Sequence, residues 1–382
     1  MNRDPGLVAE CQAISRAVTP FATIAALRSS SVWRDIEPRL RRVLGEVRRY
    51  TPSSPPPPSA DPDRIKAVHW NIEHGNWYDQ VECALRTNEE LRDGDLFLFN
   101  EIDFGMARAG NRDVTGDLAS ALGLYGVWAP LFLETTAGRD DDARMAGGRA
   151  NQEALFGIGL LSRWPIVELR IVELPSPEEY QFDLERMLGR HIGLIVTLDR
   201  PQGPFVAVSA HLEVHRTRAQ RAAQMRALLD GLADERRPVL IAGDFNTHTF
   251  DRGRAWDPVL GAWVLMFASD RALEHRLLFP DHGPTREPLF DELKHAGFEW
   301  DKLVDRTPTL QLRFDRIDEL RAFPDFVQRG VRGALAWAER RGRLRLDWFA
   351  ERGFSGGRGY TVPGFNGHGG ASDHAPIVCE LW

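Results

Sequence analysis

The stretch that most constrains the fold is VLIAGDFN at residues 239–246, an apolar run that ends in a glycine, an acid and an amide. A short aliphatic run closed by Gly is typical of a buried strand. Asp244 and Asn246 then emerge at the carboxyl end of that strand, where open α/β sheets carry their chemistry. Because residues two apart in an extended chain point to the same side, both side chains face one small reactant, such as a water. The competing interpretation is a strand that ends in an Asx turn.

Four other stretches also place a polar group beside an apolar strand. Glu101 follows the run LFLFN at 96–100, where a buried and unpaired carboxylate would be costly and a cation is the simplest compensation. The others are VHWNIE at 68–73, which presents Asn71, VAVSAHL at 206–212, which presents His211, and SDHAPIV at 372–378, which presents Asp373 and His374. All five stretches therefore share one signature, an apolar strand next to a polar cluster, with the polar residues of the last one placed just before its strand.

Strand and helix candidates alternate after residue 64, which favours a layered α/β sandwich. The strand candidates are 65–72, 95–102, 158–161, 192–198, 205–210, 239–242 and 377–381, and the helix candidates are 79–91, 115–122 and 216–232. We expect a helical extension at 1–50, a proline-rich linker at 51–63 and a catalytic domain at 64–382. Aromatic and charged residues without a clean period predict a helical insertion at about 247–345. Two amphipathic helices are expected in the extension, which either docks on the catalytic body or mediates dimerisation; a separate functional module is the alternative.

The composition is that of an ordinary globular protein, with 43% hydrophobic and 27% charged residues among 382. A formal net charge of -7 argues against a whole face that grips a polyanion, but leaves room for a local basic groove. The three cysteines form no paired framework, which favours a reducing compartment. No apolar run reaches the length of a membrane span, and Arg3, Asp4 and Glu10 interrupt the segment where a signal peptide would be apolar. We expect a cytoplasmic protein.

The ordered motifs resemble those of the endonuclease/exonuclease/phosphatase superfamily, which has the DNase I-like fold. The motifs are Trp-Asn, Asn-Glu, Ser-Ala-His-Leu, Gly-Asp-Phe-Asn, Leu-Asp-Trp and Ser-Asp-His, and they occur in this order between Ala67 and Trp382. Each motif is weak alone, but the full ordered set is specific. The resemblance implies a four-layer α/β sandwich of two packed mixed sheets flanked by helices, with the site at one edge. It does not cover the first fifty residues or most of the insertion.

The resemblance also implies roles for individual residues. Glu101 and Asn71 would bind a divalent metal, usually Mg²⁺ with Mn²⁺ as an option, with Asp373 close by. Asp244 would activate the attacking water, and Asn246 beside it would contact the water or the phosphate. His374 would stabilise developing charge or protonate the leaving group, and His211 would support it.

An acid is expected to orient His374 by hydrogen bonding. Two residues are candidates, Asp347 in RLDWF and Asp318 in RIDEL. We favour Asp347, because its flanking residues make the better strand and it lies closer in sequence to His374.

Several loop residues near the motifs are candidates for substrate contacts. They are Asn151, which precedes a strand that resembles the border of the family's substrate groove, and His215 and His248, which follow motif strands. For each of them a simple loop role is the alternative. His69 alternates with Trp70 and is interpreted as a packed or surface residue. Asn100 stands where many family members have Gln, a change that affects how Asn71 or a metal-bound water is held.

These expectations combine into a magnesium-dependent phosphoesterase that hydrolyses a phosphodiester by in-line attack of an activated water. The expected substrate is a phosphate ester from a nucleic acid, a phospholipid or a small phosphodiester, which makes the protein a nuclease or a lipid or small-molecule phosphodiesterase. The alternatives are a phosphomonoesterase of the inositol-phosphate type and a non-catalytic binding protein on the same fold. The sequence does not decide among these substrates.

Overall fold

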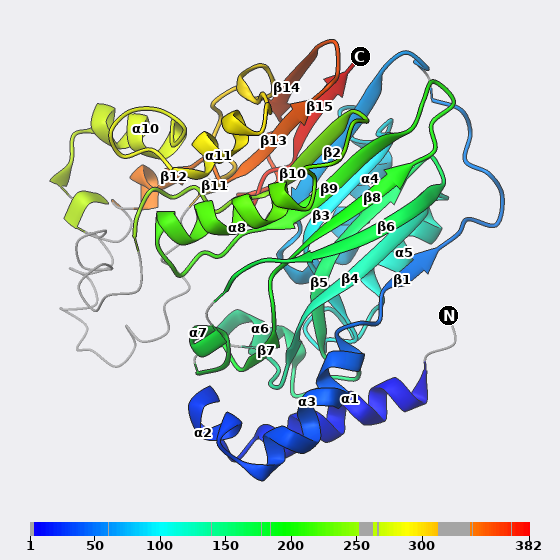
Figure 1. The fold of residues 1–382 in the computed structure, drawn as a ribbon, viewed down its shortest axis with the longest axis vertical. Helices are drawn as coiled ribbons and strands as arrows, with labels where there is room; N and C mark the ends of the chain where they lie inside the picture. The colour runs from blue at the N-terminus through cyan, green and yellow to red at the C-terminus, as the bar shows by residue number, and fades with distance from the viewer. Residues whose placement is uncertain are drawn as a thin grey trace.

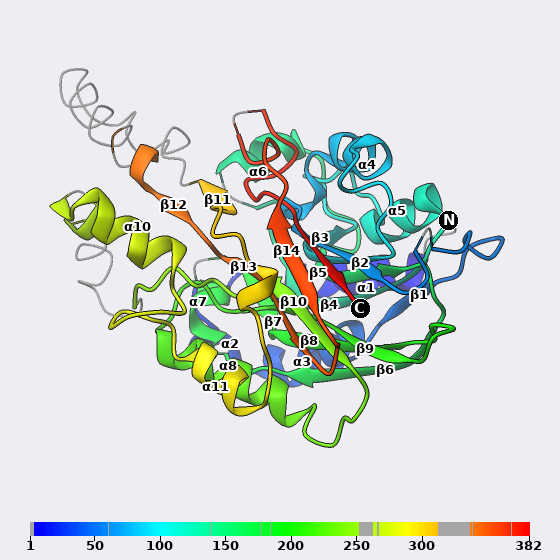
Figure 2. The same ribbon diagram turned by 90° about the horizontal axis from the view of Figure 1, so that it is seen from above.

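The computed structural model consists of two β-sheets packed face to face, with helices on both outer sides (Figure 1). It describes residues 4–382 apart from 60, 139, 177, 184, 252–262, 266, 312–336, 338 and 368. Figure 2 shows α4 (Tyr78–Thr87) and α5 (Val114–Leu122) on one side of the strands, and α8 (Arg218–Asp230) and α11 (Leu289–His295) on the other. This arrangement confirms the expected α/β sandwich of two mixed sheets flanked by helices.

The larger sheet contains eight strands within the described residues and mixes parallel with antiparallel neighbours. Its order is β1 (Arg48–Tyr50), β4 (Tyr125–Glu134), β5 (Leu155–Ser162), β3 (Leu96–Phe104), β2 (Ile65–Asn71), β15 (Ile377–Leu381) and β14 (Gly357–Thr361), and β7 (Met187–Gly189) pairs with β4. Strands β2 and β3 run parallel, with Asn71 opposite Asn100. The polar residues at the carboxyl ends of both strands therefore reach the same edge of the sheet.

The second sheet brings three of the sequence motifs onto neighbouring strands. Its order is β13 (Asp347–Arg352), β10 (Val239–Asp244), β9 (Phe205–His211), β8 (Ile192–Leu198) and β6 (Ile166–Glu173). Strand β10 is parallel to β9 and antiparallel to β13, so His211, Asp244 and Asp347 stand side by side in register. The core between the two sheets is aliphatic and aromatic, and it includes Leu98, Leu240 and Phe349. Burial of each such side chain contributes about 1.5–3 kcal/mol to folding.

The outer helices begin and end at residues that satisfy their free backbone groups. Thr217 and Gln220 form a reciprocal capping box at the start of α8. Asp113 accepts a hydrogen bond from the N–H of Gly116 at the start of α5, and Gly123 ends that helix in the left-handed conformation with φ 65°. The apolar face of α8, which includes Met225, packs on the second sheet together with α11.

Residues 4–50, the described part of the extension, contain three helices and a strand, where the sequence predicted two helices. The helices are α1 (Pro5–Val18), α2 (Ile24–Arg28) and α3 (Ser31–Val43). Thr23 caps α2 separately, because its side chain accepts a hydrogen bond from the N–H of Ala26. Helix α3 ends at Val43, where the backbone N–H of the cap residue Leu44 bonds to the last turn, and residues 48–50 then pair with the outer edge of β4 as β1.

The apolar faces of these helices pack on the catalytic body. Cys11, Ile14 and Ile36 are fully buried in one hydrophobic cluster with Leu133 and Leu155 of the larger sheet. Polar contacts reinforce this packing, since the guanidinium of Arg186 donates hydrogen bonds to two backbone carbonyls of the extension and that of Arg190 to a third. The apolar residues that suggested a dimer are therefore used within the chain. Dimerisation through other surfaces of these helices stays a prediction.

The described part of the 247–345 insertion contains short helices, turns and two short strands, and α11 packs on the second sheet. Its elements are α10 (Asp270–Leu278), α11, the 3₁₀ turn η2 (Asp301–Leu303) and the short strands β11 (Leu310–Gln311) and β12 (Arg343–Leu344). In Figure 2, α10 and β12 extend to the left beyond the sheets. The remaining elements of the fold are η1 (Glu73–Gly75), α6 (Asp140–Ala146) and α7 (Glu178–Asp183). Asp318, the second candidate for orienting His374, lies outside the described residues. Among the helices of the described chain, none is both long and apolar enough to cross a bilayer.

Candidate active site

Glu101 reaches the site through an irregularity in its strand. The pairing of β3 with β5 shifts register between Phe99 and Ile102, and Glu101 has a left-handed backbone with φ 52°. A bulge of this kind re-aims one side chain, and a non-Gly residue in the left-handed region carries strain that often marks a functional position. The carboxylate of Glu101 is thereby turned towards the strand ends of the second sheet, where it faces His211 and Asp244.

Asn71 joins the two acids of the site. Its amide nitrogen donates a hydrogen bond of 3.0 Å to Glu101 Oε1 and lies 3.2 Å from Asp244 Oδ2. Its amide oxygen accepts a hydrogen bond from the backbone N–H of Glu73. In this arrangement Asn71 holds the carboxylates together through its nitrogen, whereas the metal role implied by the family would require its oxygen to face the cation.

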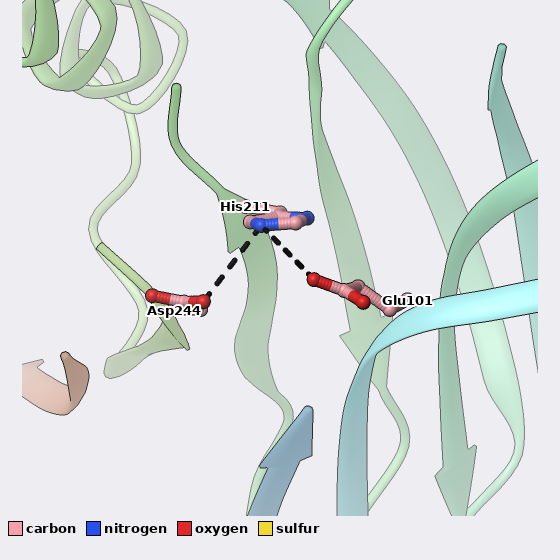
Figure 3. Close-up of side chains that lie close together, drawn as sticks. All are labelled: Glu101, His211 and Asp244. Carbon is pink, nitrogen blue, oxygen red and sulfur yellow. Dashed lines mark ion pairs between the residues drawn. The ribbon is translucent and has the colours of Figure 1, made fainter. Parts of the chain in front are cut away.

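Three ligand atoms converge beside Asn71, from Glu101, His211 and Asp244, and all lie within 4.8 Å of one another. The Nε2 atom of His211 lies 3.9 Å from Glu101 Oε1 and 3.8 Å from Asp244 Oδ2, and Figure 3 shows the imidazole between the two carboxylates. Burial, reinforced by neighbouring imidazoles, lowers the pKa of His211 to about 3, so His211 is neutral near pH 7. A neutral imidazole and two carboxylates are a suitable ligand set for a divalent metal.

Asp244 is the acid of this group that most needs a compensating charge. Its carboxylate is buried, and its Oδ1 accepts a hydrogen bond of 2.9 Å from the N–H of Asn246. Burial raises the pKa of Asp244 to about 7, against the opposing effect of His374. The Asn100 amide oxygen accepts a hydrogen bond of 2.8 Å from the backbone N–H of Asp244. The shorter amide at position 100 therefore holds the backbone of Asp244 rather than Asn71.

A histidine–aspartate pair forms the other half of the site. The Nδ1 atom of His374 lies 2.7 Å from Asp347 Oδ2. Burial opposes a charge on His374, but the neighbouring carboxylates, chiefly Asp347, outweigh it and raise the pKa of His374 well above its usual value. Burial alone would raise the pKa of Asp347, yet His374 holds it well below the usual range. His374 is thus an imidazolium whose Nε2 faces Asp244 Oδ2 at 3.7 Å.

The base of the insertion holds this pair in place through Thr309. The hydroxyl oxygen of Thr309 accepts hydrogen bonds from the N–H groups of Leu346 (3.0 Å) and Asp347 (3.3 Å). Its carbonyl accepts one of 2.7 Å from the N–H of Ala375, the residue after His374. One buried residue of the insertion therefore fixes the backbone on both sides of the histidine–aspartate pair.

Two further residues with implied roles lie at the border of the site. Asn246 has a left-handed backbone with φ 51°, and its amide nitrogen donates a hydrogen bond of 2.8 Å to the carbonyl of Leu212. Asp373 is half-buried and accepts a hydrogen bond from the hydroxyl of Ser372. Within the described residues, the groups of ligand atoms that lie within 4.8 Å of one another do not include Asp373. Asp373 acts on the site through its charge, which contributes to the raised pKa of His374.

The three predicted substrate contacts have internal partners. The Oδ1 atom of Asn151 accepts a hydrogen bond from the N–H of Ala107, and its Nδ2 donates one to the carbonyl of Thr136. His248 is buried, with its Nε2 on the carbonyl of Val214 and its Nδ1 on the N–H of Phe250. His215 is half-buried, and its backbone N–H donates to Glu213. Substrate contact by these residues stays a prediction, and the geometry of Asn151 and His248 favours a structural role.

Sequence reasoning missed a charged cluster behind Glu101. The guanidinium of Arg108 is buried, binds both oxygens of Asp103 at 2.7 and 2.9 Å, and also contacts Glu134 and Asp142. His74 lies between this cluster and the site, with Nε2 3.6 Å from Glu101 Oε2. No motif marked Arg108, because it follows its strand in an ordinary loop.

A second missed pair lies behind His211. The Nδ1 atom of His191 lies 3.2 Å from the carbonyl of His211, and its Nε2 lies 3.2 Å from Glu213 Oε2. Both nitrogens face oxygen acceptors, so both hydrogen bonds form only when the ring carries two protons. Gln181 also donates to Glu213. Glu213 follows His211 by two residues, and this spacing was the only signal in the sequence.

Residues 68–374 match the model of the Endonuclease/Exonuclease/phosphatase family. This match spans more than half of the chain, and the chain therefore belongs to that family. The resemblance drawn from the ordered motifs is confirmed, and it places the protein in a superfamily of phosphoesterases, nucleases and phosphatases. A comparison with curated proteins finds no match.

Similar solved structures include an endonuclease/exonuclease/phosphatase from Beutenbergia cavernae, with 17% identity, 83% of this chain and 71% of that chain covered, and a TM-score of 0.46. A functionally unknown conserved protein from Enterococcus faecalis has 17% identity, coverage of 83% and 99%, and a TM-score of 0.48. A 3'-5' exonuclease from Neisseria meningitidis has 15% identity, coverage of 83% and 100%, and a TM-score of 0.47. At such identities the likeness concerns the fold alone.

Proposed function

We propose that this protein is a divalent-metal-dependent phosphoesterase that hydrolyses a phosphodiester by in-line attack of water, with Mg²⁺ as its metal and Mn²⁺ as a substitute. The observation that carries this proposal is the convergence of Glu101, His211 and Asp244 within 4.8 Å, directly beside the Asp347–His374 pair. Acids for a cation and a charged imidazole for phosphate oxygens thus meet at Asp244, which belongs to both groups of side chains.

The donor set supports a metal at Glu101. Two carboxylates and one neutral imidazole face each other there, and burial raises the pKa of Asp244, so a bound cation would offset the cost of the ionised form. Glu101 would hold the metal, with Asp244 or His211 beside it, and Asn71 would join only by turning its amide oxygen towards the cation. When bound, the metal would supply Lewis-acid stabilisation of charge on the phosphate.

The remaining steps belong to the side chains of the chain itself. Asp244 would orient a water and accept its proton, and its neighbour Asn246 would limit where that water sits. His374 would place its charged Nε2–H on a phosphate oxygen or on the leaving group, while Asp347 holds the ring by its other nitrogen. The nucleophile is the water that Asp244 orients. The reaction would therefore proceed without a covalent enzyme intermediate.

The proposed substrate is a diester from a nucleic acid, a phospholipid or a small molecule, and activity assays separate these classes. The purified protein should hydrolyse bis(p-nitrophenyl) phosphate with Mg²⁺ and should lose this activity with a chelator or with the substitution Asp244→Ala. The control is Asp95→Asn, because Asp95 is a buried acid at the opposite end of β3. Equal turnover by wild type and Asp244→Ala would overturn the proposal.

A panel of plasmid DNA, RNA, sphingomyelin and inositol phosphates with Mg²⁺ then assigns the substrate class. Release of inorganic phosphate from monoesters without cleavage of any diester would identify a phosphomonoesterase instead. Absence of turnover on the whole panel, by folded protein with Mg²⁺ or Mn²⁺, would favour a binding protein.

A further inference from the structure

His69 is a fully buried polar residue in the core between the two sheets. It lies on β2 two residues before Asn71, so both side chains point to the same face of the strand. Leu98 stands opposite His69 on the neighbouring strand β3, and it belongs to the apolar core. An imidazole at such a position needs a hydrogen-bond partner, because an unpaired buried polar group is unfavourable.

The partner of His69 is the acid that orients His374. The Nε2 atom of His69 lies 3.0 Å from Asp347 Oδ1, whereas the Nδ1 atom of His374 lies 2.7 Å from Asp347 Oδ2. Asp347 is therefore held between two imidazoles, one on each carboxylate oxygen. An ionised carboxylate only accepts hydrogen bonds, so the facing nitrogen of each ring carries the proton.

This arrangement fixes the plane of the Asp347 carboxylate. The terminal torsion of an aspartate is soft and roughly two-fold, so one hydrogen bond to His374 leaves the plane free to rock. The second hydrogen bond, from the opposite sheet, removes that freedom. The His374 ring is then held with Nε2 towards Asp244, at 3.7 Å from its Oδ2.

We propose that His69 is a positioning residue that acts through Asp347 to aim His374 at the reacting phosphate. This inference rests on the proposed phosphoesterase function and adds a residue of the larger sheet that acts on Asp347 of the second sheet. His69 itself does not touch the substrate. Its contribution is the orientation of the imidazole, so its loss should lower kcat while leaving KM nearly unchanged.

Two amide substitutions separate this role from simple packing. His69→Gln carries its amide nitrogen near the position of Nε2 and keeps a donor for Asp347, whereas His69→Asn is also a polar amide but stops short of Asp347. The packing control is Leu98→Met, a change of similar volume beside His69 that removes no hydrogen bond. Thermal unfolding of each variant establishes that the folded protein is being compared.

The first readout is steady-state kinetics on the substrate that the assay panel identifies. We expect His69→Gln and Leu98→Met to keep kcat within about threefold of wild type, and His69→Asn to lower kcat by about 10- to 100-fold with KM within about twofold. Equal kcat for the folded Gln and Asn variants would overturn the proposal.

The second readout needs no activity and uses ¹⁵N-histidine NMR of the full-length protein. The Nδ1–H proton of His374, assigned by its loss in His374→Gln, should resonate far downfield in wild type and His69→Gln, and should move upfield in His69→Asn. An unchanged resonance in His69→Asn would overturn the positioning role. If wild type turns over no substrate, the proposed function fails, but this spectrum still decides whether His69 orders the pair.

Discussion

The Nε2 atom of His374 lies 3.7 Å from Oδ2 of Asp244, which ends β10 of the second sheet, whereas His374 stands in the segment that leads into β15 of the larger sheet. Asp347 keeps His374 charged, whereas burial raises the pKa of Asp244 to about 7. Asp244, which gains and loses a proton near neutral pH, therefore faces the imidazolium of His374, which keeps its proton. This difference suits Asp244 to accept a proton from water and His374 to stabilise or protonate an oxygen of the substrate.

The Asp347–His374 pair should behave as one unit in a double-mutant cycle. We expect Asp347→Asn and His374→Ala each to lower kcat by about 100-fold or more, because each removes the oriented imidazolium. The double variant should be no slower than the slower single variant, since the two residues serve one function. Steady-state kinetics of the four proteins test this, and multiplicative losses would show that the residues act independently.

Metal binding should stabilise the fold through Glu101. A ligand that binds only the native state at 100 times its Kd adds about 2.7 kcal/mol to the free energy of unfolding. We therefore expect Mg²⁺ to raise the Tm of chelator-treated wild type with increasing concentration, and Glu101→Gln to abolish that rise. Differential scanning calorimetry measures both. Asp95→Asn should keep the increase of Tm with Mg²⁺. A Tm of wild type that does not change with Mg²⁺ would count against a metal site.

The stability contributed by Glu213 should disappear in acid. Burial alone would raise the pKa of Glu213, but the hydrogen bond and charge of His191, together with the backbone hydrogen bond and charge of His215, outweigh it and lower the pKa from 4.5 to about 2. Because the folded pKa is depressed, the contribution of about 3 kcal/mol is present above pH 4.5 and is lost as the pH falls towards 2. Urea unfolding should show that the difference in free energy of unfolding between wild type and Glu213→Gln shrinks as the pH falls over this interval. A difference that does not change with pH would contradict this assignment.

The amino-terminal helices should unfold together with the catalytic body. Ile14 is fully buried in the cluster that α1 shares with the larger sheet, so Ile14→Ala should lower the free energy of unfolding by about 2–5 kcal/mol. Arg34→Ala on the exposed side of α3 should change it by less than about 0.5 kcal/mol. Far-UV and near-UV signals should follow one transition. Separate transitions would show that the helices form an independent unit.

The sequence predicted the residues that end apolar strands. Glu101, His211 and Asp244 each follow or close such a run; parallel pairing aligns the strand ends within each sheet, and the packing of the two sheets brings the two sets together. The helix at 216–232 was predicted to within two residues of α8, because its caps and apolar face are local properties. The fold class followed from the same alternation of elements.

Residues whose role depends on long-range pairing escaped sequence reasoning. His69 looked like a packed residue, because nothing near it in the sequence indicates that Asp347 lies opposite. Arg108 binds acids from two other segments, and its role appears only once β3, β4 and α6 are in place. Strand β4 was missed because Pro130 interrupts its apolar run, although the chain accommodates Pro130 at a register shift.

Strand β1 covers an edge of the larger sheet. It pairs with residues 126–128 of β4, and β7 pairs with residues 132–134 of the same strand. Strand β4 is long and almost wholly buried, and without β1 it would present an apolar border with unpaired backbone groups. A chain shortened to begin at residue 51 would keep the motif residues of the active site but would expose a template for strand addition by other molecules. The pairing of β1 therefore gives the first fifty residues a structural role, the covering of this sheet edge, that is separate from the chemistry of the site.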